Sequence, residues 1–167
     1  MTITIDSDPD RRGYRLSCEQ WLPAPLETVF EFFSDANRLE EITPDSLSFH
    51  VETPGPIDIA AGTIIDYRLR VHGIPLRWRS EITVWEPPFR FMDVQLKGPY
   101  RHWEHEHTFR EADGGTIVGD TVHYAVPGGS LIHRLFVQGD LKRIFAYRQK
   151  ILADHFAANE SLTTDRT

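Results

Sequence analysis

Two histidines on one predicted strand are the residues of this chain best placed to do chemistry. His105 and His107 lie in the segment YRHWEHEHTFR, residues 100–110. A strand points successive side chains to opposite faces, so the face that buries Trp103 and Phe109 takes both histidines with it. Buried imidazoles need hydrogen-bond partners or a neighbouring cavity. This strand is therefore predicted to form one wall of a functional site.

The hairpin turn that follows brings a carboxylate to the histidines. Asp113-Gly114 is a favoured pair for a two-residue type I′ turn, which needs a positive φ at both positions. Counting back from this turn places His107 opposite Asp120 on the buried face. A carboxylate opposite an imidazole fixes its tautomer and raises its pKa. His107 and Asp120 are thus the candidate dyad for general-base catalysis.

The same residues suggest a metal site as an alternative. His105 and His107 lie two residues apart on one face, and Asp120 would complete a set of two histidines and one carboxylate. Side chains at positions i and i+2 share an ion only in favourable rotamers, and this spacing arises by chance in a histidine-rich strand. We therefore expect neither a bound metal nor another cofactor.

Register arguments at the other turns collect further residues on the inner face. A turn at His72-Gly73 leaves the arginines of RLRVHGIPLRWR on the outer face, which indicates a solvated surface and not a nucleic-acid site. Each unpaired buried polar group costs roughly 1–3 kcal/mol, so an inner face this polar predicts a ligand pocket. The predicted ligand-binding residues are Tyr67, Trp78, Ser80, Asp93, Gln95, Trp103, His105, His107, Asp120 and Tyr124.

The elements that must position these residues follow a clear order. A strand is predicted over 13–22, and two short helices follow, the first beginning at Pro25 and the second ending before Pro44. A long helix follows Ser130, with Leu131 and Leu135 on its apolar side and a shift of that side near Gly139. Further strands are predicted near 47–53, 62–72, 75–86, 89–96, 100–111 and 115–126. The layer rule then gives an α+β fold, a curved seven-stranded antiparallel sheet wrapped around the long C-terminal helix.

Length and composition indicate one domain. Of the 167 residues, we expect 1–12 to form a disordered or extended tail, 13–157 the domain and 158–167 a flexible tail. The net charge of −7 argues against a nucleic-acid partner. No apolar stretch approaches the ~20 residues of a membrane span, so stable membrane insertion is not expected. The single cysteine, Cys18, and the lack of a signal-peptide core predict a cytoplasmic protein.

Three segments together resemble a known superfamily. WLPAPLETVFEFFSDANRLEEITP, GPYRHWEHEHTF and LKRIFAYRQKIL, in this order of elements, resemble the START/polyketide-cyclase-like (SRPBCC) helix-grip proteins over about residues 13–157. Within it the chain is most similar to bacterial cyclase/dehydrase-like ligand-binding proteins. The resemblance implies a deep cavity between sheet and C-terminal helix that holds a hydrophobic small molecule. Members include lipid-transfer domains, pollen allergens, coenzyme Q-binding proteins and aromatase/cyclases.

Residues and resemblance together give two functional hypotheses. The first is a non-catalytic protein that binds a small hydrophobic molecule, which is lipid-, polyketide- or isoprenoid-like, in this cavity. The alternative is a cyclase/aromatase- or hydrolase-like enzyme that uses His107 and Asp120 in the same cavity. Ser80 is the inward hydroxyl besides the tyrosines, and nothing in the sequence activates it as a nucleophile. Binding without catalysis is therefore the favoured hypothesis, with no prediction of the oligomeric state.

Overall fold

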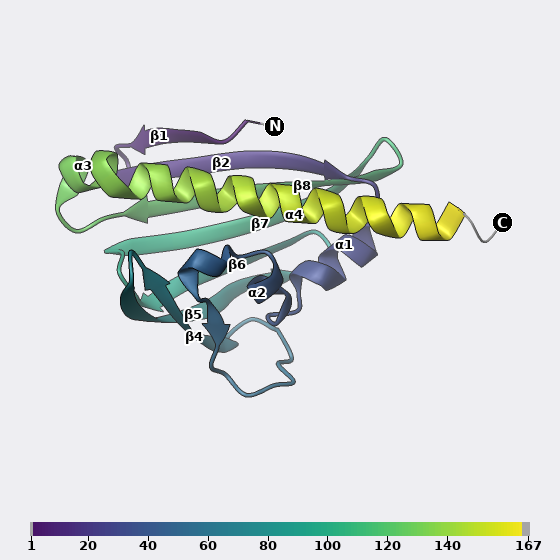
Figure 1. Cartoon of the computed structure of the whole chain (residues 1–167), viewed down its shortest axis with the longest axis horizontal. Helices are drawn as coiled ribbons and strands as arrows, with labels where there is room; N and C mark the ends of the chain where they lie inside the picture. Colours follow the sequence, from purple (N-terminus) through teal and green to yellow (C-terminus); the bar gives the residue numbers. More distant parts are fainter. Residues whose placement is uncertain (1, 165–167) are drawn as a thin grey trace.

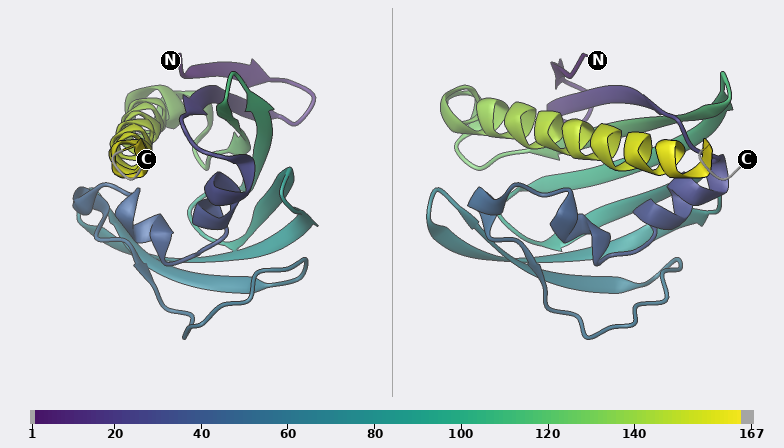
Figure 2. Two further views of the ribbon diagram at one scale, coloured as in Figure 1. Left: turned by 90° about the vertical axis from the view of Figure 1, so that its right-hand side faces the viewer. Right: turned by 45° about the vertical axis from the view of Figure 1, so that its right-hand side comes forward.

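Eight antiparallel strands form one curved sheet in this computed structural model, which describes residues 2–164. Along the sheet the strands run β1-β2-β8-β7-β6-β5-β4-β3. Figure 1 shows the long helix crossing the sheet, and Figure 2 shows the sheet curving around it and the short helices. This is the predicted α+β helix-grip fold. The elements are β1 (Thr4–Asp8), β2 (Gly13–Leu22), α1 (Leu26–Phe33), α2 (Arg38–Glu41), the 3-10 turn η1 (Asp45–Leu47), β3 (His50–Val51), β4 (Ile64–Val71), β5 (Ile74–Glu86), β6 (Arg90–Lys97), β7 (His102–Ala112), β8 (Gly115–Ala125), α3 (Gly129–Ile132), the π-helical turn η2 (His133–Val137) and α4 (Gln138–Thr164).

The strand count differs from the seven predicted because Thr4–Asp8 forms β1. Its sequence, TIDSD, lacks the alternation of apolar and polar residues that marks a half-buried strand. It pairs antiparallel with β2 through its backbone, with Ser7 opposite Tyr14. At the other end, α4 runs through Thr164. Residues 1 and 165–167 of the two predicted tails lie outside the described residues.

The two hairpins have the predicted registers. In β7 and β8, Ala112 faces Gly115 and His107 faces Asp120. In β4 and β5, Tyr67 faces Trp78. Asp113 and Gly114 have φ values of 50° and 74°, and the residues of the His72-Gly73 turn have 50° and 80°, as a type I′ turn requires. Two-residue turns therefore determine which side chains of four strands share the inner face.

Two apolar clusters fill the two ends of the space between sheet and helices. One contains Phe109 of β7, Phe30 of α1 and Phe156 of α4. The other contains Trp103 of β7 and Phe145 of α4. The intervening inward positions of β7 are the two histidines, so a polar group separates the clusters.

The C-terminal helix begins differently from the prediction. Leu131 and Leu135 were expected on its buried side, but Leu135 is 58% exposed and Leu131 is exposed as well. His133 is only 4% exposed and stacks on Tyr14 with ring centroids 3.4 Å apart. The π-helical turn η2 shifts the buried side of the helix just before Gly139, where the apolar pattern was seen to change.

Two glycine substitutions should change stability in opposite directions. Gly114 has a positive φ, so Gly114→Ala should cost about 1 kcal/mol although its Cβ would meet nothing within 4 Å. Gly139 lies in α4, where an added Cβ also meets nothing within 4 Å, so Gly139→Ala should add about 0.5–1 kcal/mol. Urea denaturation of both variants measures these values. Equal changes in the free energy of unfolding would contradict the assigned turn.

Candidate ligand-binding cavity

A cavity of about 770 Å³ lies between the inner face of the sheet and α4. The segment from α1 to η1 closes one side, and the β4–β5 hairpin and the start of α4 close another. On that side His72 Nε2 lies 2.7 Å from Asp140 Oδ2 and joins the hairpin to the helix. Most of the wall is apolar or aromatic, and the polar groups of the sheet face gather on β5, β6 and β7, with Arg148 opposite them on α4.

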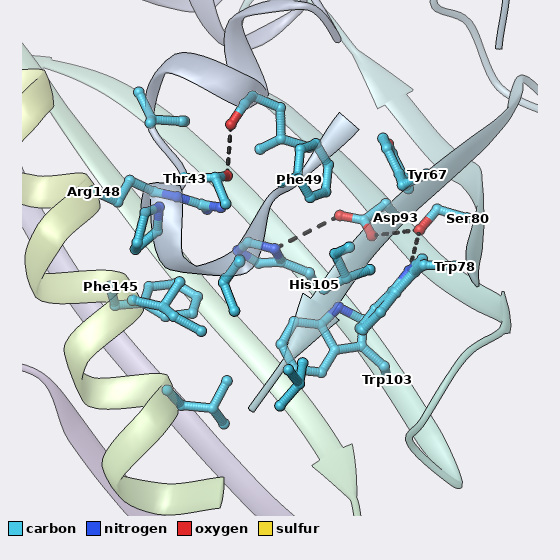
Figure 3. A pocket seen from close by; sticks show the side chains of 18 of the residues that line it. Thr43, Phe49, Tyr67, Trp78, Ser80, Asp93, Trp103, His105, Phe145 and Arg148 are labelled. Atoms are coloured by element: carbon cyan, nitrogen blue, oxygen red, sulfur yellow. Dashed lines mark hydrogen bonds and ion pairs between the residues drawn. The ribbon is translucent and has the colours of Figure 1, made fainter. Parts of the chain in front are cut away.

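Seven of the ten predicted ligand-binding residues line this cavity. They come from four neighbouring strands, and Figure 3 shows six of them as labelled sticks around the pocket. Their convergence follows from the β4–β5 hairpin register and from the pairing of β6 with β5 and β7, which sets Asp93 opposite His105. The seven residues are Tyr67, Trp78, Ser80, Asp93, Trp103, His105 and His107.

The other three predicted residues lie away from the cavity wall. Gln95 turns toward the β6–β7 connection, where its amide donates to Tyr100 O at 2.8 Å. Tyr124 is fully buried, and its hydroxyl lies 2.9 Å from His133 Nε2, which ties β8 to η2. Asp120 lies behind the two cavity histidines. These side chains support the site from outside the cavity.

Asp120 contacts both histidines with one oxygen. Its Oδ1 accepts a hydrogen bond from His105 Nε2 at 2.9 Å. The same oxygen lies 3.0 Å from His107 Nδ1, an ion-pair distance without the angle of a hydrogen bond. On its other side, Cys18 Sγ donates to Oδ2 at 3.9 Å. One buried carboxylate thus sets the orientation of both imidazoles.

The electrostatics of this group differ from the sequence-based expectation. Burial raises the pKa of Asp120, but the imidazoles of His105 and His107 outweigh burial and hold that pKa well below its usual range. Asp120 also acts to raise the pKa of His107, as predicted. Burial and the neighbouring His105 outweigh the effect of Asp120 and lower the pKa of His107 to about 3. The predicted raised pKa of His107 was therefore wrong, because desolvation dominates, and the ring is neutral at neutral pH.

Asp93 extends the polar group along β6 into the cavity. Ser80 Oγ donates to Asp93 Oδ1 at 3.3 Å, and Trp78 Nε1 donates to Ser80 Oγ at 3.0 Å (Figure 3). Burial raises the pKa of the Asp93 carboxyl, although His105 acts in the opposite direction. The carboxylate that faces the cavity beside the histidines is therefore Asp93, and not Asp120 as the sequence suggested. Asp93, His105 and His107 offer ligand atoms that all lie within 4.8 Å of one another, a spacing that could hold a metal ion.

Arg148 is the functional candidate that the predicted set missed. It is only 9% exposed, lines the cavity from α4, and points from that helix into the pocket in Figure 3. Its guanidinium lies over the Phe145 ring at 5.1 Å, and within the described chain its Nε has no hydrogen-bond partner. Its spacing in the sequence indicates its position: Arg148 lies on the same buried helix face as Leu141, Phe145 and Leu152, where a charged residue is unusual.

The fold and the cavity define a class of protein before any comparison. A curved sheet wraps around a C-terminal helix, and a cavity lies between the two. This is the helix-grip architecture of START-like ligand-binding proteins. The chain belongs to the family described as polyketide cyclase/dehydrase and lipid transport, whose model matches residues 22–148. No protein of curated function matches the chain. Among the described helices, none is both long and apolar enough to cross a membrane.

Solved structures with the same fold share little sequence with this chain. Protein TTHA0849 from Thermus thermophilus is 23% identical, with a TM-score of 0.70 over 87% of this chain and 98% of its own. Protein Ms6760 from Mycobacterium smegmatis is 18% identical, with a TM-score of 0.67 over 95% and 99%. The ginseng major latex-like protein 151 from Panax ginseng is 10% identical, with a TM-score of 0.64 over 85% and 96%. These similarities support the fold and leave the ligand open.

Among the buried polar residues Asp93, His105, His107 and Asp120, loss of the Asp120 charge should be the most destabilising isosteric change. The folded-state pKa of Asp120 is lowered, so its ionised form stabilises the fold above the unfolded-state pKa. That contribution is lost as the pH falls through the folded-state pKa. Asp120→Asn should cost about 3–5 kcal/mol at neutral pH and should flatten the acid limb of the stability–pH curve. Urea denaturation at a series of pH values measures both effects.

Asp66→Asn is the matched control for this measurement. Asp66 is half-exposed and pairs with Arg79 at 2.8 Å on the outer face of the sheet. Surface pairs of this kind contribute below about 1 kcal/mol. Equal losses in the two variants would show that Asp120 does not organise the buried group.

Proposed function

We propose that this protein binds an amphiphile whose apolar body fills the cavity and whose acidic end group pairs with Arg148. The observation that carries this proposal is a buried guanidinium that lines a largely apolar cavity and whose Nε has no hydrogen-bond partner in the described chain. A volume of about 770 Å³ lies within the usual range of small-molecule sites. A lipid-like, polyketide-like or isoprenoid-like acid meets both requirements.

The cost of burying Arg148 argues for an acidic ligand. An ion removed from water loses several kcal/mol of solvation, and an opposite charge is the usual compensation. In this cavity the Phe145 ring compensates part of the cost through a cation–π contact. A carboxylate or phosphate bound in the fork of the guanidinium would supply charge-assisted hydrogen bonds as well. The ligand therefore supplies what the protein leaves unpaired.

The rest of the wall sets the shape and orientation of the ligand. Trp78 and Trp103 meet edge to face with ring centroids 5.3 Å apart, and their perpendicular rings form an apolar corner for the ligand body. Asp93, which has a raised pKa, can donate a hydrogen bond to a ligand oxygen when protonated. We propose that all seven lining residues of the predicted set contact the ligand.

A cyclase/aromatase- or hydrolase-like enzyme is the second candidate, and one observation favours it. His107 Nε2 lies on the cavity side of the ring while Nδ1 lies 3.0 Å from Asp120, which is the orientation of a general base in a dyad. The ring is neutral at neutral pH, which is the form that accepts a proton, although its pKa of about 3 makes it a weaker base than an ordinary imidazole. The family description, which names cyclases and dehydrases beside lipid transport, fits this candidate too.

Paired ligands that differ only in charge test the proposed binding. Hexadecanoic acid and hexadecanol have equal chains, and quenching of Trp78 and Trp103 in the wall reports their binding. A charge-assisted hydrogen bond contributes about 1.5–3 kcal/mol, so the acid should bind about 10–150-fold more tightly. Arg148→Met should bring the acid to the affinity of the alcohol and leave the alcohol unchanged. Arg143→Met removes an exposed arginine at the cavity edge that pairs with Asp140, and it should change neither affinity.

Each unfavourable result of this titration has a separate meaning. Binding of neither compound would contradict an amphiphile cavity. Equal binding of acid and alcohol by the unmodified protein would contradict the acidic end group and leave the cavity function standing. Retention of the acid preference by Arg148→Met would assign the preference to another group.

The fate of the bound ligand separates a binding protein from an enzyme. Ligands that co-purify from the expression host should be recovered by extraction with unchanged mass after long incubation with the protein. His107→Ala should leave their mass spectrum the same. A product formed by the unmodified protein and lost in His107→Ala would support the enzyme instead.

A further inference from the structure

Three potential ligand atoms converge on the cavity wall from two neighbouring strands. His105 and His107 of β7 and Asp93 of β6 each offer one, and all three lie within 4.8 Å of one another. His105 Nδ1 lies 3.7 Å and His107 Nε2 lies 3.9 Å from Asp93 Oδ2. We propose that these side chains bind one divalent transition-metal ion of the kind that nitrogen and carboxylate ligands favour, with zinc as the probe.

The two imidazoles turn their lone pairs toward Asp93. Their other nitrogens, Nε2 of His105 and Nδ1 of His107, face one oxygen of Asp120 at 2.9 and 3.0 Å. A carboxylate oxygen accepts hydrogen bonds, so in the singly protonated form of each ring the N–H belongs on the nitrogen that faces Asp120. The nitrogens on the Asp93 side are then free to act as metal ligands.

An excess of acceptors results at this point of the wall. Two nitrogen lone pairs and Asp93 Oδ2 face one another at distances too long for hydrogen bonds. The hydroxyl of Ser80 donates to Oδ1, the other oxygen of Asp93. A single cation would satisfy all three acceptors at once.

The distances are close to those around a bound ion. Zinc holds nitrogen and oxygen ligands at ~2.0–2.2 Å, which places tetrahedral ligand atoms roughly 3.3 Å apart. The observed 3.7 and 3.9 Å require Asp93 to approach the histidines by a few tenths of an ångström. Its side chain keeps 19% of its surface exposed, so it has room for this movement.

The surroundings match those of a functional metal site. Histidine ligands usually donate their second ring N–H to a carboxylate, which orients the ring, and Asp120 stands in this place for both rings. Three protein ligands leave further coordination positions open toward the cavity. The cationic Arg148 lines the same cavity, so a ligand bound to the ion would need anionic character.

Zinc titration of metal-free protein by calorimetry, without any amphiphile, tests the proposal. The unmodified protein should bind one zinc per chain. Asp93→Asn and His107→Gln should each weaken zinc binding by about 100-fold or more, because each removes a ligand. Asp120→Asn should weaken it by about 10–100-fold, as expected for a residue that only orients the ligands. His50→Gln, at the exposed position of β3, is the control and should leave the affinity unchanged.

A second readout covers variants that lose the fold. Circular dichroism identifies such variants, and the visible absorption of bound Co²⁺ in the unmodified protein then reports directly on its nitrogen and oxygen ligands. No stoichiometric binding of either ion by the folded unmodified protein would overturn the proposal. So would equal zinc affinities in Asp93→Asn and His50→Gln. The amphiphile titrations run without metal, so the two proposals can fail independently.

Discussion

The buried carboxylate of Asp120 is the constraint on which the rest of the site depends. A carboxylate without water must be compensated, and here two imidazoles from the neighbouring strand share one of its oxygens. The hydrogen bond orients His105, the 3.0 Å contact orients His107, and both turn the remaining nitrogen of each ring toward Asp93. This pair of contacts also requires the antiparallel register of β7 and β8, because a slip of one residue in either strand would turn Asp120 or the two histidines to the opposite face and separate them. Register, tautomer and cavity polarity are therefore parts of one arrangement.

The polar group also explains why the molecule has a cavity instead of a single continuous core. Apolar side chains pack at both ends of α4, around Phe156 at one end and Phe145 at the other. Between them the inner face of β7 carries two histidines, which cannot be covered by apolar side chains without losing their hydrogen-bonding capacity. The remaining space is lined by aromatic rings, Asp93 and the guanidinium of Arg148. Such a mixture suits an amphiphile better than either a dry core or a water channel.

The sequence predicted the parts of this structure that depend on local rules. Two turns, Asp113-Gly114 and His72-Gly73, force positive φ values, and counting from them gave the pairing of four strands. Counting along strands could not predict which inward side chains reach the cavity. Asp120 and Gln95 share the inward parity of the lining residues, yet the contact of Asp120 with His105 and that of Gln95 with the Tyr100 backbone place them outside the cavity. Arg148 was recognisable only as a charge on an apolar helix face, and β1 has no alternating pattern at all.

The short outermost strands have a consequence for the behaviour of the protein in a crowded solution. A sheet of eight strands that does not close into a barrel has two edges, each with unpaired backbone groups that another chain can extend. Here one edge is β1, with five residues, and the other is β3, with two. Neither offers a long template for pairing with a second sheet. The longer strands that carry the polar cavity wall, β5, β6 and β7, lie inside the sheet and have a hydrogen-bonded strand on each side, so they present no edge to a second chain.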